Sequence, residues 1–342
     1  MKGVLLVNLG SPDSPSKSDV RKYLDEFLMD PRVIDLPYLV RAFVVKGFVL
    51  NTRPARSAEA YAKVWTEEGS PLIVISERLK SALSEKLDMP VALGMRYGSM
   101  SIEKGIAELK SAGVDDVLLV PLYPQFAMSS TETVMEKAKE VMSRFPGVKL
   151  EVLPPFYNDK LYEDAIVSSI KKKFKENDHL LLSYHGVPER HIRKSDISGH
   201  CTIDSTCCFT ENKSHEYCYR HQCFNTTERI VKRLGLKEGE YTNAFQSRLG
   251  TTKWLEPYTA EIIAEMPSRG IKHLSVVTPS FVSDCLETLE EMDMENREIF
   301  MDAGGESFNY IPCLNETSDF VYALESWCLS WSENNLRTYS IT

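Results

Sequence analysis

Short, almost wholly apolar runs alternate along the chain with longer stretches in which apolar residues recur every three or four positions. The short runs predict buried strands and the periodic stretches predict helices, an order typical of βαβ units around mostly parallel sheets. Eight strands are expected, four in each half of the chain, at 3–8, 91–95, 116–121, 150–154, 179–184, 241–245, 273–279 and 307–311. Helices are expected at 20–29, 75–86, 101–111, 131–144, 161–176, 227–234, 260–265, 284–302 and 318–330.

The two sets of strands indicate a duplicated architecture. GVLLVNLGSP (3–12) opens the first half and DHLLLSYHGVP (178–188) the second, while VLLVPLYPQF (117–126) is matched by LSVVTPSFVSD (274–284). We therefore predict an α/β fold with two Rossmann-like lobes, 1–157 and 158–331, each with a four-stranded, mostly parallel sheet flanked by helices. Residues 332–342 are expected to form a tail without regular structure. Since ligands of such sheets bind beyond the carboxyl ends of strands, the site is expected in a cleft between the lobes.

Composition and charge narrow the class of protein. Hydrophobic residues make up 43% and charged residues 26% of the 342 residues, the profile of a soluble globular protein. The net charge of −9 argues against a nucleic-acid partner, which would call for a basic surface. The apolar segment 36–50 is interrupted by Arg41 and Lys46 and is shorter than the roughly 18 residues that span a membrane. We expect a cytoplasmic protein whose segment 36–50 touches the membrane surface.

A histidine and a row of carboxylates follow two of the predicted strands. His185 ends the run HLLLSYH, and Asp284, Glu287 and Glu291 follow HLSVVTP at a spacing that places them on one helical face. Taken alone, a histidine is more often structural than functional, and a carboxylate run is more often solvated surface. The position at strand ends favours function here. Imidazole and carboxylate ligands together suit a divalent ion such as Fe²⁺.

Basic and aromatic residues form a second candidate group: Arg53, Arg56, Arg96, Tyr97, Tyr123, Phe126 and Trp254. A flat aromatic ligand that carries carboxylates would require aromatic faces and arginine forks of this kind. No GxGxxG, P-loop or GxSxG sequence occurs in the chain, which argues against a dinucleotide enzyme, a P-loop nucleotide hydrolase and a serine hydrolase.

Five of the eight cysteines lie within 23 residues, in the pattern C-x5-C-C-x9-C-x4-C: Cys201, Cys207, Cys208, Cys218 and Cys223. In a reducing cytosol such a group indicates metal or redox chemistry and not disulfides. The pattern lacks the paired C-x2-C of a zinc ribbon.

Taken together and in this order, the motifs resemble the ferrochelatase family from about residue 2 to about residue 327. The resemblance rests on VNLGSPDSP (7–15), TRPARSAEAY (52–61), EEGSPL (67–72), GMRYG (94–98), PLYPQF (121–126), SYHG (183–186), FQSRLG (245–250), KWLEPYT (253–259), FVSDCLETLEE (281–291) and IPCLN (311–315). It implies a chelatase fold, a porphyrin cleft, and a hydrophobic lip at 36–50 that meets the membrane. The implied reaction is insertion of Fe²⁺ into protoporphyrin IX to form protohaem, the terminal step of haem biosynthesis.

The resemblance also implies roles for individual residues. His185 is similar to the family's essential histidine and is the expected proton acceptor. Glu287 is similar to its partner carboxylate, and Asp284 and Glu291 continue the row; these four are the expected contacts of iron. The expected contacts of the porphyrin are Leu9, Arg53, Arg96, Tyr97, Tyr123, Phe126, Trp254 and Phe281.

Two departures from the family pattern bear on substrate and mechanism. Leu9 stands where the branch that uses coproporphyrin has tyrosine, which favours protoporphyrin IX as the substrate. Cys285 stands where many relatives have a second histidine, so the resemblance carries no ligand role for that position. The alternatives are a chelatase for coproporphyrin or sirohydrochlorin, and a non-catalytic porphyrin- or haem-binding protein, which would not need the acidic row.

Some ferrochelatases carry a [2Fe–2S] cluster, and the resemblance raises that question for the cysteine-rich segment 191–223. The animal arrangement uses C-terminal cysteines, of which this chain has only Cys328, so a cluster would have to be built inside this segment. The predicted ligands are Cys201, Cys208, Cys218 and Cys223. Cys207 is the expected spare, because adjacent cysteines are poor joint ligands of one small cluster. Structural zinc and free thiols are the alternatives.

Overall fold

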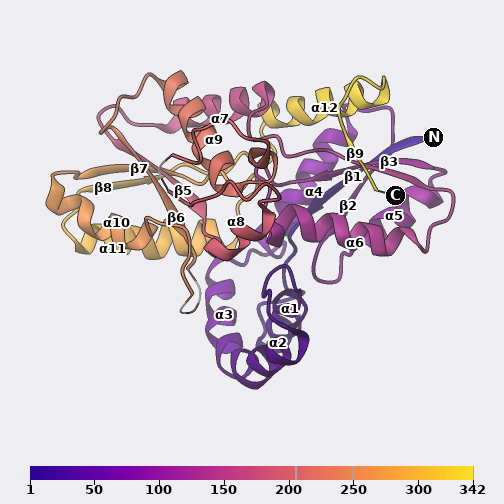
Figure 1. Cartoon of the computed structure of the whole chain (residues 1–342), viewed down its shortest axis with the longest axis horizontal. Coiled ribbons are helices and arrows are strands. Elements are labelled where there is room, and N and C mark those ends of the chain that lie inside the picture. Colours follow the sequence, from indigo (N-terminus) through magenta and orange to yellow (C-terminus); the bar gives the residue numbers. More distant parts are fainter. Residues whose placement is uncertain (205, 249, 251, 342) are drawn as a thin grey trace. The chain divides into compact units, whose positions relative to one another are not determined.

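The computed structural model describes residues 1–204, 206–248, 250 and 252–341. The chain forms two compact units, which we describe one at a time. The first unit contains Met1–Tyr123, Met128–Pro155 and Glu316–Thr342, and the second contains Pro124–Ala127 and Phe156–Asn315. Each unit has one sheet flanked by helices, as Figure 1 shows, so the predicted α/β class with parallel sheets is confirmed.

The sheet of the first unit has the strand order β2-β1-β3-β4-β9. The strands are β1 (Lys2–Asn8), β2 (Val91–Met95), β3 (Asp116–Pro121), β4 (Lys149–Val152) and β9 (Tyr339–Ser340). The first four run parallel and match the predicted strands to within two residues. The fifth, β9, pairs antiparallel with β4 and lies in the tail for which no regular structure was expected. Two residues are too few to produce a periodic pattern, and the pairing partner is far away in sequence.

The helices of this unit are α1 (Lys17–Leu28), α2 (Tyr38–Val44), the π-helical η1 (Val45–Val49), α3 (Leu50–Val64), α4 (Pro71–Ser84), α5 (Ile102–Ser111), η2 (Met128–Glu132), α6 (Thr133–Met142) and α12 (Ser318–Ser332). Side-chain caps begin two of them: the hydroxyls of Ser16 and Ser101 accept hydrogen bonds from backbone N–H groups three residues on. A core cluster joins the sheet to α5 and α6, and includes Leu5, Val7, Ile106 and Ala138.

The position of α12 differs from the predicted division, which placed residues up to 331 in the C-terminal lobe. Its residues belong to the first unit, where α12 packs against α4. Lys2 Nζ donates hydrogen bonds to the carbonyl oxygens of Trp331 and Ser332, both at 3.0 Å, and lies over the Trp331 ring. These contacts join the two ends of the chain, and no local pattern in the sequence encodes them.

The segment from Tyr38 to Val64 is continuously helical, with the π-helical η1 in its middle. In Figure 1, α1, α2 and α3 form a helical group at one end of the first sheet. The helices α2 and α3 were not predicted. In α2, apolar residues lie on the exposed side and hide the amphipathic period. Leu39 and Phe43 are 80% and 66% exposed. Among the described residues, no helix is long and apolar enough to cross a membrane.

The sheet of the second unit has the order β6-β5-β7-β8, and all of its strands are parallel. They are β5 (His179–His185), β6 (Tyr241–Gln246), β7 (His273–Val277) and β8 (Ser307–Tyr310), which confirms the four predicted strands. The helical elements are α7 (Lys160–Lys173), α8 (Glu189–Ser195), the 3₁₀ turns η3 (Lys213–Glu216) and η4 (Met266–Arg269), α9 (Tyr219–Leu234), α10 (Thr259–Glu265), the π-helical η5 (Glu287–Glu295) and α11 (Asn296–Asp302).

Candidate active site

His185 is the last residue of β5, at the carboxyl end of a central strand of the second sheet. Its backbone is held on both sides: its N–H donates to Ser280 Oγ at 2.9 Å, and its carbonyl oxygen accepts from the Tyr219 hydroxyl at 2.8 Å. The ring Nδ1 lies 2.7 Å from the carbonyl oxygen of Gly186. A carbonyl can only accept, so Nδ1 carries the proton and Nε2 is left with a free lone pair.

The environment of the imidazole favours its neutral form. Burial lowers the pKa of His185, while the nearby Glu287 carboxylate and the hydrogen bond to Gly186 oppose that shift. The net direction is downward, so the ring is unprotonated at neutral pH and able to accept a proton at Nε2.

Gly186, which has no side chain, allows the backbone after His185 to lie close to Gln246 and Trp254. A Cβ at this position would lie 2.7 Å from the carbonyl oxygen of Gln246 and 3.2 Å from Trp254 Cε3. The Phe281 ring meets the His185 ring edge to face, with centroids 6.0 Å apart. Trp254 Nε1 is buried and has no hydrogen-bond partner among the described residues. The structure therefore brings Trp254 close to Gly186 and Phe281 close to His185, so these predicted site residues lie near one strand end.

The carboxylate row lies on η5. An α-helix was predicted over 284–302, but residues Glu287–Glu295 wind as a π-helix before α11 begins. The wider turn is visible in its hydrogen bonds, because the N–H of Asn296 donates to the carbonyl of Glu291, five residues back. Gln246, buried beside the strand end, donates from Nε2 to the Glu287 carbonyl at 3.1 Å. This contact attaches the start of η5 to β6, the strand that pairs with β5 at His185.

Glu291 has a partner that the sequence did not indicate. Its carboxylate accepts the backbone N–H of Ser247 at 2.8 Å and the Ser247 hydroxyl at 2.5 Å. Ser247 adopts the left-handed conformation, with φ of 65°. Burial raises the pKa of Glu291 to about 7, the charges of Glu287 and Glu295 add to the rise, and the Ser247 hydrogen bonds limit it.

Glu295 is a further member of the carboxylate row that was not predicted, because its charge contributes to the raised pKa of Glu291. Glu287, Glu291 and Glu295 follow one another at intervals of four residues along η5, and Glu291 interacts with both neighbours. The four-residue spacing of these glutamates is visible in the sequence, but the predicted row began at Asp284 and ended at Glu291.

Asp284 lies before η5 and is arranged differently from the glutamates. It is buried, and Oδ1 accepts hydrogen bonds from the Tyr310 hydroxyl at 2.7 Å, Thr288 Oγ1 at 3.1 Å and the Cys313 N–H at 3.3 Å. Oδ2 accepts from Asn315 Nδ2 at 2.7 Å. Both oxygens are thus occupied by internal donors, which makes this carboxylate an anchor between the loop before η5 and the loop after β8.

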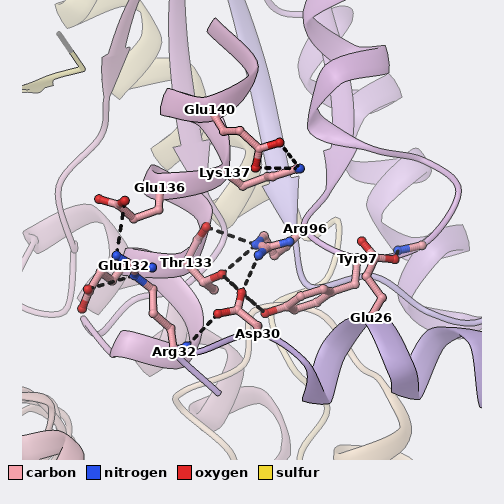
Figure 2. Close-up of polar contacts among 11 residues, drawn as sticks. Glu26, Asp30, Arg32, Arg96, Tyr97, Glu132, Thr133, Glu136, Lys137 and Glu140 are labelled. Atoms are coloured by element: carbon pink, nitrogen blue, oxygen red, sulfur yellow. Dashed lines mark hydrogen bonds and ion pairs between the residues drawn. The ribbon is translucent and has the colours of Figure 1, made fainter. Parts of the chain in front are cut away.

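In the first unit, Arg96 and Tyr97 follow β2 and belong to a buried polar network centred on Asp30 (Figure 2). Arg96 donates from Nη2 to Asp30 Oδ2 and from Nε to Thr133 Oγ1, the latter at 2.7 Å. The Tyr97 hydroxyl and the Thr133 hydroxyl donate to the same Asp30 oxygen. Asp30 was not predicted, although a carboxylate just after a helix is unfavourable beside the helix dipole and could have served as a signal.

The remaining predicted contacts are distributed over both units. Tyr123 follows β3; its hydroxyl is buried without a hydrogen-bond partner among the described residues, and burial raises its pKa. Leu9 is partly buried after β1, and Arg53 is exposed on α3. Phe126 belongs to the second unit, where its ring meets Tyr217 at a centroid distance of 5.2 Å.

The cysteine-rich segment lies between α8 and α9 of the second unit, and all eight cysteines of the chain are free. Four thiols interact with one another there, those of Cys201, Cys207, Cys208 and Cys218. Across the described chain, no three His, Cys, Asp or Glu side chains already stand in the arrangement of a metal site.

Comparisons with known proteins agree with this architecture. The family model described as ferrochelatase matches residues 1–330. The chain is 49% identical over 329 residues to the ferrochelatase of Ectopseudomonas mendocina (strain ymp), covering 95% of this chain and 96% of that protein. It is 48% identical over 331 residues to the ferrochelatase of Azotobacter vinelandii (strain DJ / ATCC BAA-1303), covering 95% and 97%.

The fold is similar to that of SirB from Bacillus subtilis with Fe³⁺, with a TM-score of 0.56 at 13% identity over 98% of each chain. It is also similar to the sirohydrochlorin chelatase SirB from Bacillus subtilis subspecies spizizenii in complex with cobalt, with a TM-score of 0.55 at 12% identity over 97% and 96%. Parallel sheets flanked by helices, of the kind seen in SirB, define a protein of the chelatase fold. The chain belongs to the ferrochelatase family, and is thus an enzyme of the metal chelatase class.

Proposed function

We propose that the enzyme inserts Fe²⁺ into protoporphyrin IX and forms protohaem. The observation that carries this proposal is the neutral His185 imidazole at the end of β5, with Nε2 free and Glu287 close enough to influence its pKa. Family membership supports the reaction class. Leu9 after β1 supports protoporphyrin over coproporphyrin, because the branch that uses coproporphyrin has tyrosine at this position.

In the proposed reaction, iron replaces two pyrrole N–H protons, so each turnover releases two protons. His185 accepts a pyrrole proton at Nε2, and the Glu287 carboxylate stabilises the imidazolium that forms. Glu291, with a pKa of about 7, exchanges protons readily at neutral pH and passes them outward along η5.

We propose His185, Glu287 and Glu291 as the side chains that meet the incoming Fe²⁺. Carboxylates and one imidazole bind ferrous iron without the tight retention expected of thiolates, which suits an ion that must be handed on. Asp284 stays outside this set because both of its oxygens accept hydrogen bonds from the protein.

For the porphyrin, we propose ring contacts from Phe281 and Trp254 beside His185. Leu9, Arg53, Tyr123 and Phe126 remain proposed contacts on the basis of the family resemblance. Arg96 and Tyr97 also remain proposed contacts on the basis of the family resemblance, although Asp30 already engages Arg96 Nη2 and the Tyr97 hydroxyl.

We also propose that the enzyme works in the cytoplasm at a membrane surface, which it touches through the apolar side of α2 and η1. Five exposed hydrophobic side chains there support this: Tyr38, Leu39, Val40, Phe43 and Phe48. Side chains of this kind bind shallowly at the interface between lipid headgroups and acyl chains.

We also propose that the cysteine-rich segment 191–223 holds a [2Fe–2S] cluster. Such a cluster exchanges one electron when bound. The support for it is the family resemblance, together with the mutual influence of the Cys201, Cys207, Cys208 and Cys218 thiols.

The test is anaerobic turnover of the purified protein with Fe²⁺ and protoporphyrin IX, followed by haem absorbance. His185→Ala and Glu287→Ala should each lower kcat by about 10²–10⁴-fold, the usual contribution of proton transfer. His273→Ala, at an exposed histidine of the same sheet, and Glu298→Ala, at an exposed glutamate of α11, are the matched controls and should retain activity. Full activity of Glu287→Ala at saturating iron would refute its role. Tight porphyrin binding without turnover by the wild type would refute the reaction itself.

A further inference from the structure

Gln246 lies beside the central histidine at the end of β6, and it was not among the predicted site residues. In the parallel pair of β5 and β6, its Cα is the partner of His185. The residue is 2% exposed. Its carbonyl oxygen accepts the N–H of Gly186 at 2.8 Å, so the end of β6 is attached to the turn that follows His185.

The side-chain amide of Gln246 has a fixed orientation. Nε2 lies 3.1 Å from the carbonyl oxygen of Glu287, and Oε1 lies 2.9 Å from Ser183 Oγ. Because a carbonyl oxygen can only accept a hydrogen bond, the amide nitrogen must face Glu287 and the amide oxygen must face Ser183. The Ser183 hydroxyl therefore donates its single proton to Gln246, and Thr259 Oγ1, at 2.8 Å, donates to Ser183 in turn.

These contacts form one directed chain of hydrogen bonds through four elements of the second unit. It begins at Thr259 on α10, passes through Ser183 on β5 and Gln246 on β6, and ends at Glu287, the first residue of η5. The three side chains of this chain are each no more than 2% exposed, so their hydrogen bonds are shielded from water. The main chain of Glu287 is thereby fixed relative to the strand end that carries His185.

Ser247, the next residue, attaches the following turn of η5. Its N–H and its hydroxyl both donate to the Glu291 carboxylate, at 2.8 and 2.5 Å. Gln246 and Ser247 thus hold two members of the carboxylate row that are four residues apart, one through its main chain and the other through its side chain. A shift of η5 along the end of β6 would break both attachments.

The position of Glu287 matters for the proposed reaction, because its carboxylate stabilises the charge that develops on His185. Such stabilisation depends on the distance between the two charges, and misplacement of a group by about 1 Å can reduce a rate by about 10²-fold. The amide of Gln246 does not titrate, so Gln246 influences the reaction through the place that it gives Glu287.

We propose that Gln246 is a positioning residue that holds the Glu287 carboxylate beside the His185 imidazole, and that Ser183 orients the Gln246 amide for this role. The inference rests on the proposed function. It concerns how the second unit places a group that the proposed reaction uses, and it adds no group to those that exchange protons or meet iron.

The test is a double-mutant cycle of Gln246→Met and Glu287→Ala, read as kcat in anaerobic turnover with Fe²⁺ and protoporphyrin IX. Methionine keeps the length of glutamine but removes both hydrogen bonds of the amide. In the wild-type background, Gln246→Met should lower kcat about 10–10²-fold and leave the KM for protoporphyrin unchanged, because the lost contact serves the transition state. In the Glu287→Ala background it should have no further effect, since the carboxylate that it positions is gone.

A role in folding alone predicts a different result. General damage to the second unit would lower kcat by similar factors in both backgrounds, and that outcome would overturn the inference. Ser275→Ala is the matched control, because it removes a fully buried hydroxyl of the same sheet that donates to Asp178 at 2.6 Å. It should retain the wild-type kcat. Circular dichroism checks that every variant is folded.

Ser183→Ala keeps the inference testable if Gln246→Met does not fold. This variant removes one hydroxyl, leaves Gln246 in place and takes away the group that orients its amide. It should lower kcat less than Gln246→Met does, and again only while Glu287 is present. An unchanged kcat in folded Gln246→Met, or in Ser183→Ala where only that variant folds, would overturn the inference.

Failure of the proposed function is distinguishable from failure of this inference. The first appears as absence of turnover by the wild type or as full activity of Glu287→Ala, and either result would overturn the positioning role as well. The second appears only in the variants of Gln246 and Ser183, beside an active wild type and an impaired Glu287→Ala.

Discussion

The buried ion pair between Asp30 and Arg96 allows a quantitative prediction about the stability of the first unit. The two side chains are 4% and 12% exposed, and Asp30 also accepts hydrogen bonds from Tyr97, Thr133 and the N–H of Arg32. Asp30→Ala would leave a guanidinium uncompensated in a nearly water-free position. Removal of one partner of such a pair costs about 3–5 kcal/mol, because the remaining charge keeps its desolvation penalty.

A matched control lies in the same unit and is drawn in Figure 2. Lys137 and Glu140 form an ion pair on α6 at 2.9 Å, with side chains 30% and 55% exposed. Solvent-exposed pairs contribute about 0–1 kcal/mol, so Glu140→Ala should change the unfolding free energy by no more than that. The predicted difference between the two variants is therefore at least about 2 kcal/mol.

The assay is urea unfolding followed by tryptophan fluorescence, which reports mainly on the first unit because Trp65, Trp327 and Trp331 belong to it. Hydrogen bonds and the charge of Arg96 outweigh the effect of burial and hold the pKa of Asp30 below its ordinary value. A depressed carboxyl pKa contributes stability that is present above the unfolded value, about 3.9, and is lost as pH falls through the folded value. The gap between wild type and Asp30→Ala should thus narrow below about pH 4. Equal effects of Asp30→Ala and Glu140→Ala at pH 7 would refute the reasoning.

Three further predictions concern other parts of the molecule. The pKa of Glu291 is raised to about 7, so the wild type should lose stability relative to Glu291→Gln as pH rises from 4.5 to 7. Unfolding free energies of the two proteins that change in parallel over that range would contradict the raised pKa. Asp284→Ala should lower the unfolding free energy by about 2–4 kcal/mol in urea titrations, because it leaves buried donors unpaired. The exposed Asp302→Ala is its control, and equal losses in the two variants would count against the anchoring role. The double variant Leu39→Asp with Phe43→Asp should bind anionic vesicles at least about tenfold more weakly in co-sedimentation, with turnover of detergent-dispersed porphyrin unchanged. Unaltered vesicle binding would exclude α2 as the contact.

Local pattern was sufficient for the strands of both sheets apart from β9, for the family, and for the place of His185 at a strand end. Strands buried on both faces of a parallel sheet read as continuous apolar runs, and β2 and β3 have the bounds that were predicted. The motifs that carry the resemblance are themselves contiguous segments. His185 was found for the same reason, because it ends such a run at a strand's carboxyl end.

Tertiary structure decided which residues pair with the charged side chains. Arg96 meets Asp30 across 66 residues, and Ser247 meets Glu291 across 44. Asp284 is held by Tyr310 at the end of β8 and by Asn315 after it. Periodicity reports which face of an element is buried, but it says nothing about which distant residue will stand opposite. A buried charge must find a partner wherever the fold places one, and that choice is made only when the chain has packed.

The same distinction explains the position of α12. The helical period of α12 was visible in the sequence, whereas its attachment to the first unit depends on contacts with Lys2 at the other end of the chain. Secondary structure follows from short-range patterns because its energetics are local, while pairing and docking follow from burial that the whole fold creates.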